Sequence, residues 1–319
     1  MGEAMKIVVL DGYTLNPGDN PWSALEAFGD VSIFERSTTA EILSRASHAD
    51  VVLTNKAALP AGVIESLPKL KFVSVMATGY NVVDVAAARA RGIVVSNVPD
   101  YGTNTVAQYV MALLLELCHH VGDHANAVRD AAWTNCVDWT FCRTPQIELY
   151  GKTMGIVGFG RIGRRVAALA EAFGMRVIYN SRRAYEDVPQ GYRVLENLFA
   201  EADVVSLHCG LTTENDGMVN SHLLARMKPS AFLINTARGR LVNEGDLASA
   251  LAKGVLAGAA VDVLSSEPPS ADNPLLSAKN CLVTPHIAWA ALEARQRIMQ
   301  TTVENVRAFL DGAPMNVVS

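Results

Sequence analysis

The sequence has no excess of basic residues, no long unbroken apolar run and no paired-cysteine motif. It contains 27 Lys and Arg against 32 Asp and Glu in 319 residues, a formal net charge of −5. Nucleic-acid-binding domains need clustered Lys and Arg, and a membrane helix needs about 20 consecutive apolar residues. The amino-terminal residues also lack the charged, apolar and small-residue zones of a signal peptide. We therefore expect no nucleic-acid partner, no membrane partner and a cytoplasmic location.

Cysteine and histidine are present without the spacing of a disulfide framework or a metal site. The seven histidines show no ligand spacing, and the adjacent His119 and His120 would point in different directions on a helix. We expect reduced thiols, as in a cytosolic protein, and no metal. The five cysteines are Cys118, Cys136, Cys142, Cys209 and Cys281.

Short apolar segments alternate with helical patterns along most of the chain. A length of 319 residues corresponds to about two domains at roughly 150 residues each. β-Branched runs separated by helices are typical of a parallel sheet covered on both faces. The sequence therefore predicts an α/β protein with two parallel-sheet domains. The predicted strands are 6–10, 31–34, 51–54, 72–76 and 93–96, followed by 153–157, 176–179, 204–208, 231–235, 258–263 and 282–284.

Two helical stretches decide where the domains divide. Residues 103–121 are apolar on nearly all sides, which is typical of a helix buried within one subunit or between two. Residues 293–310 form the last predicted helix, and nothing after residue 290 is large enough to fold alone. We expect this helix to return to the first domain. The predicted domains are 1–101 with 290–319, and 102–289.

A glycine motif follows the first strand of the second series. In a turn between a strand and a helix, Gly158 would permit a tight turn, Gly160 would let the backbone approach a pyrophosphate and Gly163 would allow close packing of helix on strand. An apolar strand precedes the motif and a helical pattern, 164–173, follows it. This context favours a dinucleotide site over a glycine-rich turn without a ligand. The motif G-x-G-x-x-G is formed by Gly158, Phe159, Gly160, Arg161, Ile162 and Gly163.

The residues expected to meet the adenosine ribose include no carboxylate. The motif requires an acidic residue about 20 positions on, to bind the ribose 2′-hydroxyl. This sequence has instead Asn180, Ser181, Arg182 and Arg183. A guanidinium suits a 2′-phosphate, which a carboxylate would repel. The pattern favours NADP(H). NAD(H) stays possible if the arginines form only a solvated turn and Asn180 serves the ribose.

Three charged residues each follow a predicted strand of the second domain. Reduction of a 2-oxo acid needs a cation for the carboxylate and carbonyl, a proton donor for the developing alkoxide and a group that tunes this donor. Arg238, Glu267 and His286 offer one candidate for each, at strand ends where α/β folds place their ligands. Taken singly, they could instead be a surface ion pair, a loop charge and a capping or core histidine.

Together, these motifs resemble those of the D-isomer-specific 2-hydroxyacid dehydrogenase family over essentially the whole chain. The resemblance implies that the domain of 1–101 with 290–319 is flavodoxin-like and binds substrate. It implies that the domain of 102–289 is of the Rossmann type and binds NAD(P), with a cleft between the two domains. It also implies a homodimer formed through the 103–121 helix and the region after it. The motifs are GFGRIG at 158–163, NTARG at 235–239, Glu267-Pro268, PHIAW at 285–289, LHCGLT at 207–212, ATGYNVVD at 77–84 and TNTVAQYVMALLL at 103–115.

The resemblance implies catalytic and substrate-binding roles for matching residues. Arg238 would bind the substrate carboxylate and carbonyl oxygen. His286 would act as general acid in reduction and general base in oxidation. Glu267 would hydrogen-bond the imidazole and favour its protonated form. Thr78 and Gly79, in the first domain, would offer backbone N–H groups to the substrate carboxylate.

A larger set is expected to line the cofactor. Within it, the Asp262 side chain would lie near the nicotinamide carboxamide. The set comprises Thr105, Val106, Gly158, Phe159, Gly160, Arg161, Ile162, Gly163, Asn180, Ser181, Arg182, Arg183, His208, Cys209, Gly210, Thr236, Ala237, Arg238, Asp262, His286 and Ala288.

The substrate is predicted from fewer residues. Within the family, segments 11–18 and 286–289 look most like those of glycerate dehydrogenases, also called hydroxypyruvate reductases. Trp139 and Phe141 lie in a loop that could close over the substrate site of the same or the partner subunit. Large aromatic side chains there would favour short acids such as glyoxylate and hydroxypyruvate. Ordinary interface packing is the alternative for both residues.

Two alternative functions stay open. The substrate could be another D-2-hydroxy acid, such as phosphoglycerate or a lactate-type acid. The protein could also be a dinucleotide-sensing binding protein, like the corepressors that share this fold and keep the same three residues. Rapid turnover of hydroxypyruvate or glyoxylate would exclude the second alternative.

Overall fold

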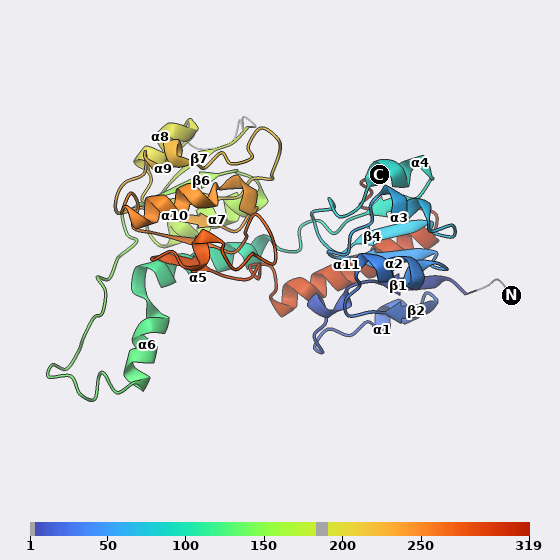
Figure 1. The fold of residues 1–319 in the computed structure, drawn as a ribbon, viewed down its shortest axis with the longest axis horizontal. Coiled ribbons are helices and arrows are strands. Elements are labelled where there is room, and N and C mark those ends of the chain that lie inside the picture. Colours follow the sequence, from blue (N-terminus) through green and yellow to red (C-terminus); the bar gives the residue numbers. More distant parts are fainter. Residues whose placement is uncertain (1–3, 183–190) are drawn as a thin grey trace. The chain divides into compact units, whose positions relative to one another are not determined.

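The computed structural model describes residues 4–182 and 191–319, which fall into two compact units. Unit 1 comprises Met1–Gly102 and Ala290–Ser319, and unit 2 comprises Thr103–Trp289. In Figure 1 the blue and cyan amino-terminal part and the red carboxyl-terminal helix belong to unit 1. Each unit is built on one parallel sheet, so the predicted α/β class is confirmed.

Unit 1 contains five parallel strands in the order β2-β1-β3-β4-β5, which is the flavodoxin-like order. The central strands β3 and β4 are buried along their whole length, whereas the edge strand β2 is largely exposed. Continuous apolar strands are what a sheet covered on both faces requires. The strands are β1 (Lys6–Val9), β2 (Asp30–Ile33), β3 (Val51–Thr54), β4 (Phe72–Val75) and β5 (Val94–Ser96).

Side-chain caps explain where two helices of unit 1 begin. The Asp84 carboxylate accepts a hydrogen bond from Ala87 N at the start of α4. Thr38 and Glu41 form a capping box at the start of α2. The helices of unit 1 are α1 (Ser23–Glu26), α2 (Thr39–Ala46), α3 (Ala61–Glu65), α4 (Val85–Ala90) and α11 (Leu292–Leu310), with the 3₁₀ turn η1 (Gly12–Thr14).

Helix α11 returns the end of the chain to unit 1. Its Phe309 ring stacks on Phe72 of β4, with ring centroids 4.6 Å apart. The buried Arg295 pairs with Asp19 at 2.5 Å and donates to the Leu15 carbonyl oxygen at 3.1 Å. These contacts join the last 30 residues to the first 102, so unit 1 is formed by two separate stretches of the chain.

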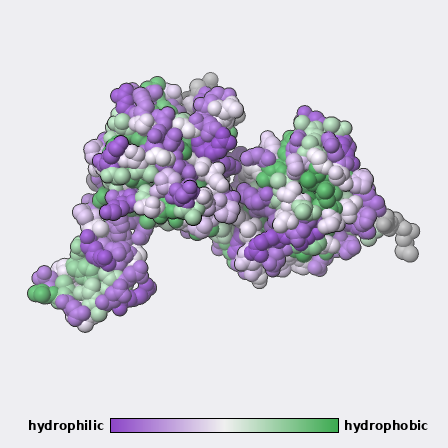
Figure 2. Space-filling model, in the orientation of Figure 1, coloured by the Kyte–Doolittle hydropathy of each residue, from purple (hydrophilic) through white to green (hydrophobic). Residues whose placement is uncertain are grey.

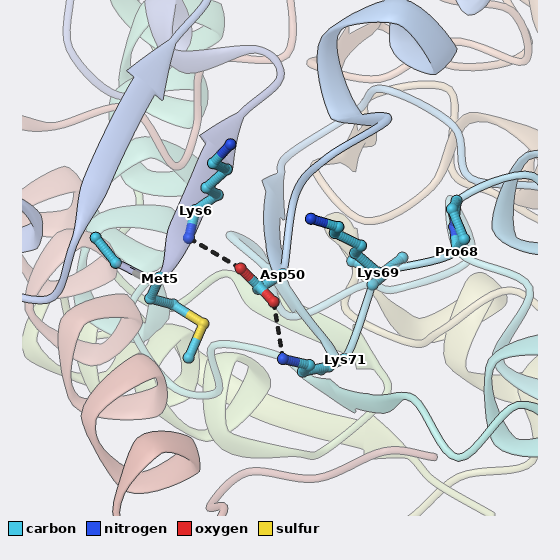
Figure 3. A pocket seen from close by; sticks show the side chains of 8 residues that line it. Met5, Lys6, Asp50, Pro68, Lys69 and Lys71 are labelled. Atoms are coloured by element: carbon cyan, nitrogen blue, oxygen red, sulfur yellow. Dashed lines mark hydrogen bonds and ion pairs between the residues drawn. The ribbon is translucent and has the colours of Figure 1, made fainter. Parts of the chain in front are cut away.

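A hollow of about 440 Å³ lies at the amino-terminal edge of the unit 1 sheet, beside Lys6, Asp50, Lys69 and Lys71 (Figure 3). The Asp50 carboxylate accepts from Lys6 N at 3.1 Å and pairs with Lys71 Nζ at 2.8 Å. These residues stand at or just before the first residues of β1, β3 and β4, so the carboxylate ties the strand starts together. Parallel sheets of α/β proteins bind ligands at the opposite, carboxyl-terminal edge. We therefore assign this hollow a structural role.

Unit 2 contains six parallel strands in the order β11-β10-β9-β8-β6-β7. Tyr192 makes an isolated parallel bridge to Tyr179 of β7. The chain at Tyr192 therefore takes the place of one more strand at the β7 edge of the sheet. Counted from β6, this is the 3-2-1-4-5-6 order of dinucleotide-binding sheets, with β11 added at the far edge. The strands are β6 (Thr153–Val157), β7 (Arg176–Asn180), β8 (Val204–Leu207), β9 (Phe232–Asn235), β10 (Gly258–Val261) and β11 (Cys281–Val283).

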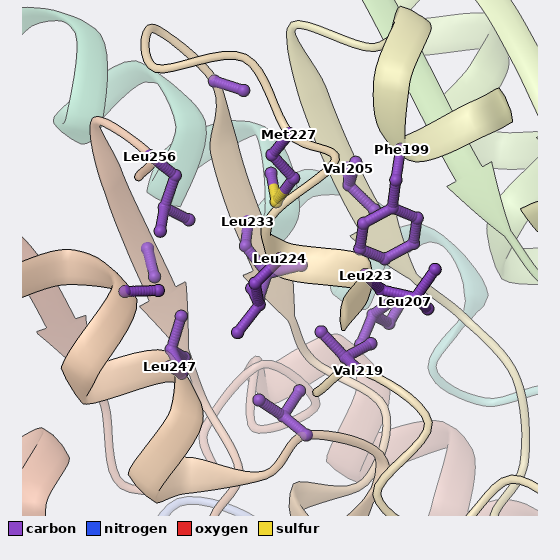
Figure 4. Close-up of a cluster of buried hydrophobic side chains, with 14 of the residues drawn as sticks. Phe199, Val205, Leu207, Val219, Leu223, Leu224, Met227, Leu233, Leu247 and Leu256 are labelled. Carbon is purple, nitrogen blue, oxygen red and sulfur yellow. The ribbon is translucent and has the colours of Figure 1, made fainter. Parts of the chain in front are cut away.

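The unit 2 sheet is covered on both faces. Successive residues of β9 point to opposite faces: Leu233 joins the apolar cluster under α8, α9 and α10, whereas Phe232 and Ile234 join the cluster under α5 and α7. Figure 4 shows the first cluster, with Phe199 and Leu247 contributed by two of its helices. The helices are α5 (Thr103–His119), α6 (Val121–Arg129), α7 (Arg161–Ala172), α8 (Leu195–Glu201), α9 (Ser221–Leu224) and α10 (Glu244–Ala252), with η2 (Gly239–Leu241) and η3 (Pro274–Leu276).

The prediction of one helix over 103–121 is wrong at its carboxyl end. Helix α5 ends at His119, His120 adopts a left-handed conformation with φ 47°, and Val121 begins α6. The apolar pattern runs through this break, so hydrophobicity did not mark it. A left-handed residue ends a helix by turning the chain away from its axis.

Residues 121–148 form a segment that projects away from the rest of unit 2 (Figure 1). Two hydrogen bonds tie it together, from Trp133 Nε1 to the Trp139 carbonyl oxygen at 3.0 Å and from Arg143 N to His124 Nε2 at 3.1 Å. Figure 2 shows hydrophobic surface on this segment. Its exposed large apolar residues are Val121, Val128, Trp133, Val137 and Trp139.

None of the helices in the described ranges has the length and apolarity that a membrane span requires.

Candidate active site

The glycine motif forms the turn from β6 into α7, at the carboxyl end of a strand that lies between β7 and β8. Gly160 is the N-cap of α7 and Arg161 is its first residue, so the helix begins before the predicted residue 164. The first N–H groups of an α-helix point toward its amino end and are not used by the hydrogen bonds between successive turns. The Phe159 ring packs on Tyr179 of β7, with centroids 4.3 Å apart.

The three motif glycines meet three different steric requirements. Gly158 has φ 96°, and a Cβ there would lie 2.6 Å from the carbonyl carbon of His208. A Cβ on Gly163 would lie 2.2 Å from the Gly158 oxygen, so the helix packs directly on the turn. A Cβ on Gly160 would meet nothing within 4 Å. Open space beside Gly160, at a helix amino end, fits a bound pyrophosphate.

The end of β7 carries the residues predicted to meet the adenosine ribose. Asn180 Nδ2 donates to the Arg193 carbonyl oxygen at 2.8 Å, and the Asn180 carbonyl oxygen accepts from Gly158 N at 2.9 Å. Ser181 and the exposed Arg182 follow. Arg183 lies outside the described residues. The position that an acidic residue would hold is therefore occupied by an amide. The NH₂ group of this amide is already hydrogen-bonded to the main chain at Arg193.

His208, Cys209 and Gly210 follow β8 and pass beside the glycine turn. His208 Nε2 lies 2.8 Å from Ser206 Oγ, and burial lowers the pKa of His208 to about 3. The imidazole is therefore neutral at pH 7. Burial raises the pKa of the Cys209 thiol, against the opposing charge of Arg182. His208 and Cys209 themselves therefore add no negative charge beside the glycine turn.

The three predicted catalytic residues follow β9, β10 and β11, which are consecutive strands of one sheet. Neighbouring strands lie about 4.8 Å apart. Hydrogen bonds continue beyond the strands, from Asp262 N to the Asn235 oxygen at 2.9 Å and from His286 N to the Asp262 oxygen at 2.8 Å. The loops that carry Arg238, Glu267 and His286 therefore leave the sheet side by side.

His286 and Glu267 form a hydrogen-bonded pair. His286 Nδ1 lies 2.6 Å from Glu267 Oε2, and since a carboxylate only accepts, Nδ1 carries the proton. The other carboxylate oxygen, Oε1, accepts from Leu264 N at 3.0 Å, which fixes the Glu267 side chain. The imidazole is thereby oriented by a held carboxylate, and its Nε2 makes no hydrogen bond to residues 4–182 or 191–319.

Arg238 stands beside the loop that leads to Glu267. A Cβ on Gly239 would lie 1.9 Å from the Leu264 carbonyl carbon, so the two backbones are in contact and only glycine fits. Asn235 Nδ2 donates to the Arg238 carbonyl oxygen at 2.9 Å, which holds the backbone at this point. The exposed guanidinium donates to the Ala237 carbonyl oxygen at 2.7 Å. A cation is thus presented at the same sheet edge as the imidazole.

Asp262 makes contacts that the sequence pattern did not predict. Its buried carboxylate accepts from Thr284 Oγ1, Ile287 N and Ala288 N, which flank His286. The sequence analysis placed Asp262 inside the predicted strand 258–263, which gave no sign that its side chain binds the next loop. In the structure β10 ends at Val261, so Asp262 follows the strand.

The remaining predicted cofactor residues of unit 2 lie near the same edge or at the start of α5. Thr236 Oγ1 is buried and has no hydrogen-bond partner within the described ranges. Ala237 N donates to Asn235 Oδ1 at 3.0 Å. Thr105 and the buried Val106 stand in the first turn of α5. A buried hydroxyl of this kind is one that a polar ligand would satisfy.

Three predicted substrate-binding residues are not carried by the strand ends of this edge. Thr78 and Gly79 belong to unit 1, where Thr78 Oγ1 donates to the Val98 carbonyl oxygen at 2.9 Å. Trp139 lies in the projecting segment of unit 2 and is 86 % exposed. The roles proposed for them stay predictions.

Within the described ranges, no three His, Cys, Asp or Glu side chains are grouped to hold a metal ion.

Comparison with known proteins identifies relatives of the whole chain. Residues 111–288 match the family model described as D-isomer specific 2-hydroxyacid dehydrogenase, NAD binding domain. The hydroxypyruvate reductase of Blautia hydrogenotrophica is 48% identical, covering 99% of this chain and 100% of its own. The glycerate dehydrogenase of Methylorubrum extorquens is 41% identical, covering 88% of this chain and 89% of its own.

A solved structure shows the same similarity in three dimensions. The NADPH-dependent glyoxylate/hydroxypyruvate reductase of Sinorhizobium meliloti, in complex with NADP and malonate, superposes with a TM-score of 0.85. It is 29% identical, and the match covers 99% of this chain and 97% of that one.

Proposed function

Since this chain belongs to the D-isomer specific 2-hydroxyacid dehydrogenase family, we propose that it reduces hydroxypyruvate and glyoxylate to the corresponding 2-hydroxy acids, with D-glycerate as the product from hydroxypyruvate. The observation that carries the proposal is the His286–Glu267 pair at 2.6 Å, at the sheet edge that also carries Arg238. The names of the relatives, all reductases or dehydrogenases, favour an enzyme over a dinucleotide-sensing binding protein.

Arg238 binds and polarises the substrate in this proposal. Its guanidinium has five N–H donors, which suit a carboxylate and an adjacent carbonyl oxygen. By holding the carbonyl oxygen, the cation stabilises the negative charge that develops there. A bound nicotinamide supplies the hydride that the carbonyl carbon receives.

His286 supplies the proton in this proposal. Its Nε2 donates to the carbonyl oxygen during reduction and removes the same proton during oxidation. Glu267 accepts from Nδ1 and holds the ring in one tautomer and one orientation. Because Leu264 N holds the Glu267 carboxylate, the ring keeps one orientation between turnovers.

A panel of 2-oxo acids tests the proposed substrates. Each acid is supplied with NADPH and separately with NADH, and oxidation is followed at 340 nm. We expect the highest kcat/KM with hydroxypyruvate or glyoxylate and lower values with pyruvate and phosphohydroxypyruvate. A higher kcat/KM with pyruvate or the phosphorylated acid would instead assign the protein to a lactate-type or phosphoglycerate-type substrate.

We further propose that NADP(H) is preferred over NAD(H). Asn180 leaves the ribose position without a carboxylate, and the exposed Arg182 follows it. Replacing Arg182 and Arg183 together with alanine is expected to raise KM for NADPH by at least about 10-fold, because each charged hydrogen bond to a phosphate contributes roughly 1.5–3 kcal/mol. KM for NADH should change much less.

The exposed Arg165 of α7 offers a matched control for this prediction. Arg165→Ala removes a positive charge from the same unit and should leave both Michaelis constants near the wild-type values. Equal catalytic efficiency of the wild type with both cofactors, or equal losses in the double variant, would contradict the preference.

We propose that the protein is a homodimer whose subunits meet through the projecting segment. Trp133, Val137 and Trp139 are exposed there, and apolar surface of this kind marks an interaction site. Sedimentation at micromolar concentration should give the mass of two chains, and Val137→Asp with Trp133→Ser should shift it toward one. A monomeric wild type would overturn the proposal. Whether Trp139 reaches the site of its own or of the partner subunit stays open.

We also propose a cytoplasmic location. The support is that the chain carries five free cysteines, including the exposed Cys142, which a reducing compartment would keep as thiols. Fractionation of cells that express the protein tests this proposal.

A further inference from the structure

Asp262 follows β10 and is almost fully buried, with 1 % of its surface exposed. Both of its carboxylate oxygens are engaged. Oδ1 accepts from Thr284 Oγ1 at 2.7 Å and from Ile287 N at 2.9 Å, and Oδ2 accepts from Ala288 N at 2.8 Å. All three donors lie within two residues of His286, so one buried carboxylate holds the loop on both sides of the imidazole.

The loop that Asp262 holds is in a conformation that the chain would not keep by itself. His286 has φ 55°, in the left-handed region that residues other than glycine seldom occupy. Such a conformation is unfavourable for a residue other than glycine and persists only where the surrounding structure fixes it. His286 N is also bound, to the Asp262 carbonyl oxygen at 2.8 Å and the Thr284 carbonyl oxygen at 3.0 Å. The main chain and side chain of Asp262 thus both act on this loop.

We infer that Asp262 is a positioning residue, which holds His286 in the backbone conformation that keeps its imidazole on Glu267. The inference rests on the proposed function and adds a role to the contact with the nicotinamide carboxamide that the resemblance implies. The two roles differ in what they affect. A positioning role acts on the chemical step, whereas a carboxamide contact alone acts on cofactor affinity.

Asparagine at position 262 separates these roles because it keeps the size and loses an acceptor. In either orientation of the amide, its NH₂ group faces at least one N–H donor of the loop, so at least one of the three bonds is lost. Displacement of a reacting group by about 1 Å can lower the rate of the chemical step by about 100-fold. We expect Asp262→Asn to lower kcat at saturating cofactor by about 10- to 100-fold.

Thr284→Val provides a milder change at the same carboxylate. It removes one donor to Oδ1 and leaves the charge in place, so a reduction in kcat of a few-fold is expected, with the Kd of the reduced cofactor unchanged in fluorescence titration. Asp203→Asn is the matched control. The Asp203 carboxylate also accepts a hydrogen bond from a backbone N–H, that of Thr153 at 2.8 Å, but at the amino-terminal edge of the same sheet. The kcat of the Asp203→Asn variant should be close to the wild-type value.

A double-mutant cycle decides whether Asp262 acts through His286. In a His286→Ala background, adding Asp262→Asn should lower the residual kcat by less than about two-fold, because the side chain that Asp262 positions is gone. A loss as large as in the wild-type background would overturn the inference. It would also be overturned if Asp262→Asn raised only the cofactor Kd and left kcat intact. A wild type that turned over no 2-oxo acid would refute the proposed function instead, which distinguishes the two failures.

Discussion

Replacing His286 with alanine is expected to lower kcat by about 10²–10⁴-fold in both directions, the range typical of a lost general acid–base. The imidazole is hydrogen-bonded at Nδ1 to a fixed carboxylate, and its Nε2 is left to exchange a proton with the substrate oxygen. Alanine removes this donor in reduction and this acceptor in oxidation. The binding of the reduced cofactor, measured by fluorescence titration, should stay nearly intact.

His222→Ala is the matched control for this substitution. His222 is exposed in the short helix α9 of the same unit, and its loss should leave kcat within about two-fold of the wild type, as for most surface changes. An unchanged rate in His286→Ala would remove this residue from the mechanism. Loss of cofactor binding along with the rate would indicate a folding defect, which a thermal unfolding curve detects.

Replacing Arg238 with alanine is expected to lower kcat/KM by about 10²–10⁴-fold, a loss of several kcal/mol of transition-state stabilisation. The guanidinium is the exposed cation beside the loop of Glu267, and its backbone is fixed by Asn235 and by the contact of Gly239 with Leu264. Loss of the cation removes both the carboxylate contact and the polarisation of the carbonyl. Steady-state kinetics with hydroxypyruvate and each cofactor measure the loss.

Arg240 offers a control two residues away. Its exposed guanidinium pairs with Asp216, and Arg240→Ala should change kcat/KM little. Arg238→Lys should recover only part of the rate, because an ammonium keeps the charge without the planar pair of donors. A lysine variant as active as the wild type would show that charge alone suffices. An active alanine variant would remove Arg238 from the substrate site.

The sequence predicts much of this fold because most of the strands are short apolar runs separated by helical patterns. The predicted strand 51–54 matches β3 without change, and 204–208 differs from β8 by one residue. Where the prediction failed, the cause was local geometry. The left-handed turn at His120 lies inside a long apolar stretch, and the single bridge at Tyr192 is too short to give a strand pattern.

Some contacts of the candidate site could likewise be predicted from the sequence, and others could not. The steric roles predicted for Gly158 and Gly163 follow from spacing and are matched by the contacts that a Cβ would make there. The clamp of Asp262 on the loop of His286 could not be predicted, because it joins two strand ends that are about 24 positions apart and adjacent only once the sheet has formed. Contacts between neighbouring strand ends depend on the strand order, which no single segment of sequence contains.

Transfer of a labelled hydrogen tests the central claim most directly. Hydroxypyruvate is supplied with NADPH, and separately with NADH, deuterated on the transferable position of nicotinamide C4, and the product is analysed by mass spectrometry and chiral chromatography. The proposed site predicts D-glycerate with one deuterium on C2, formed rapidly by the wild type and far more slowly by His286→Ala. Tight binding of the cofactor without transfer of deuterium to any 2-oxo acid would contradict it.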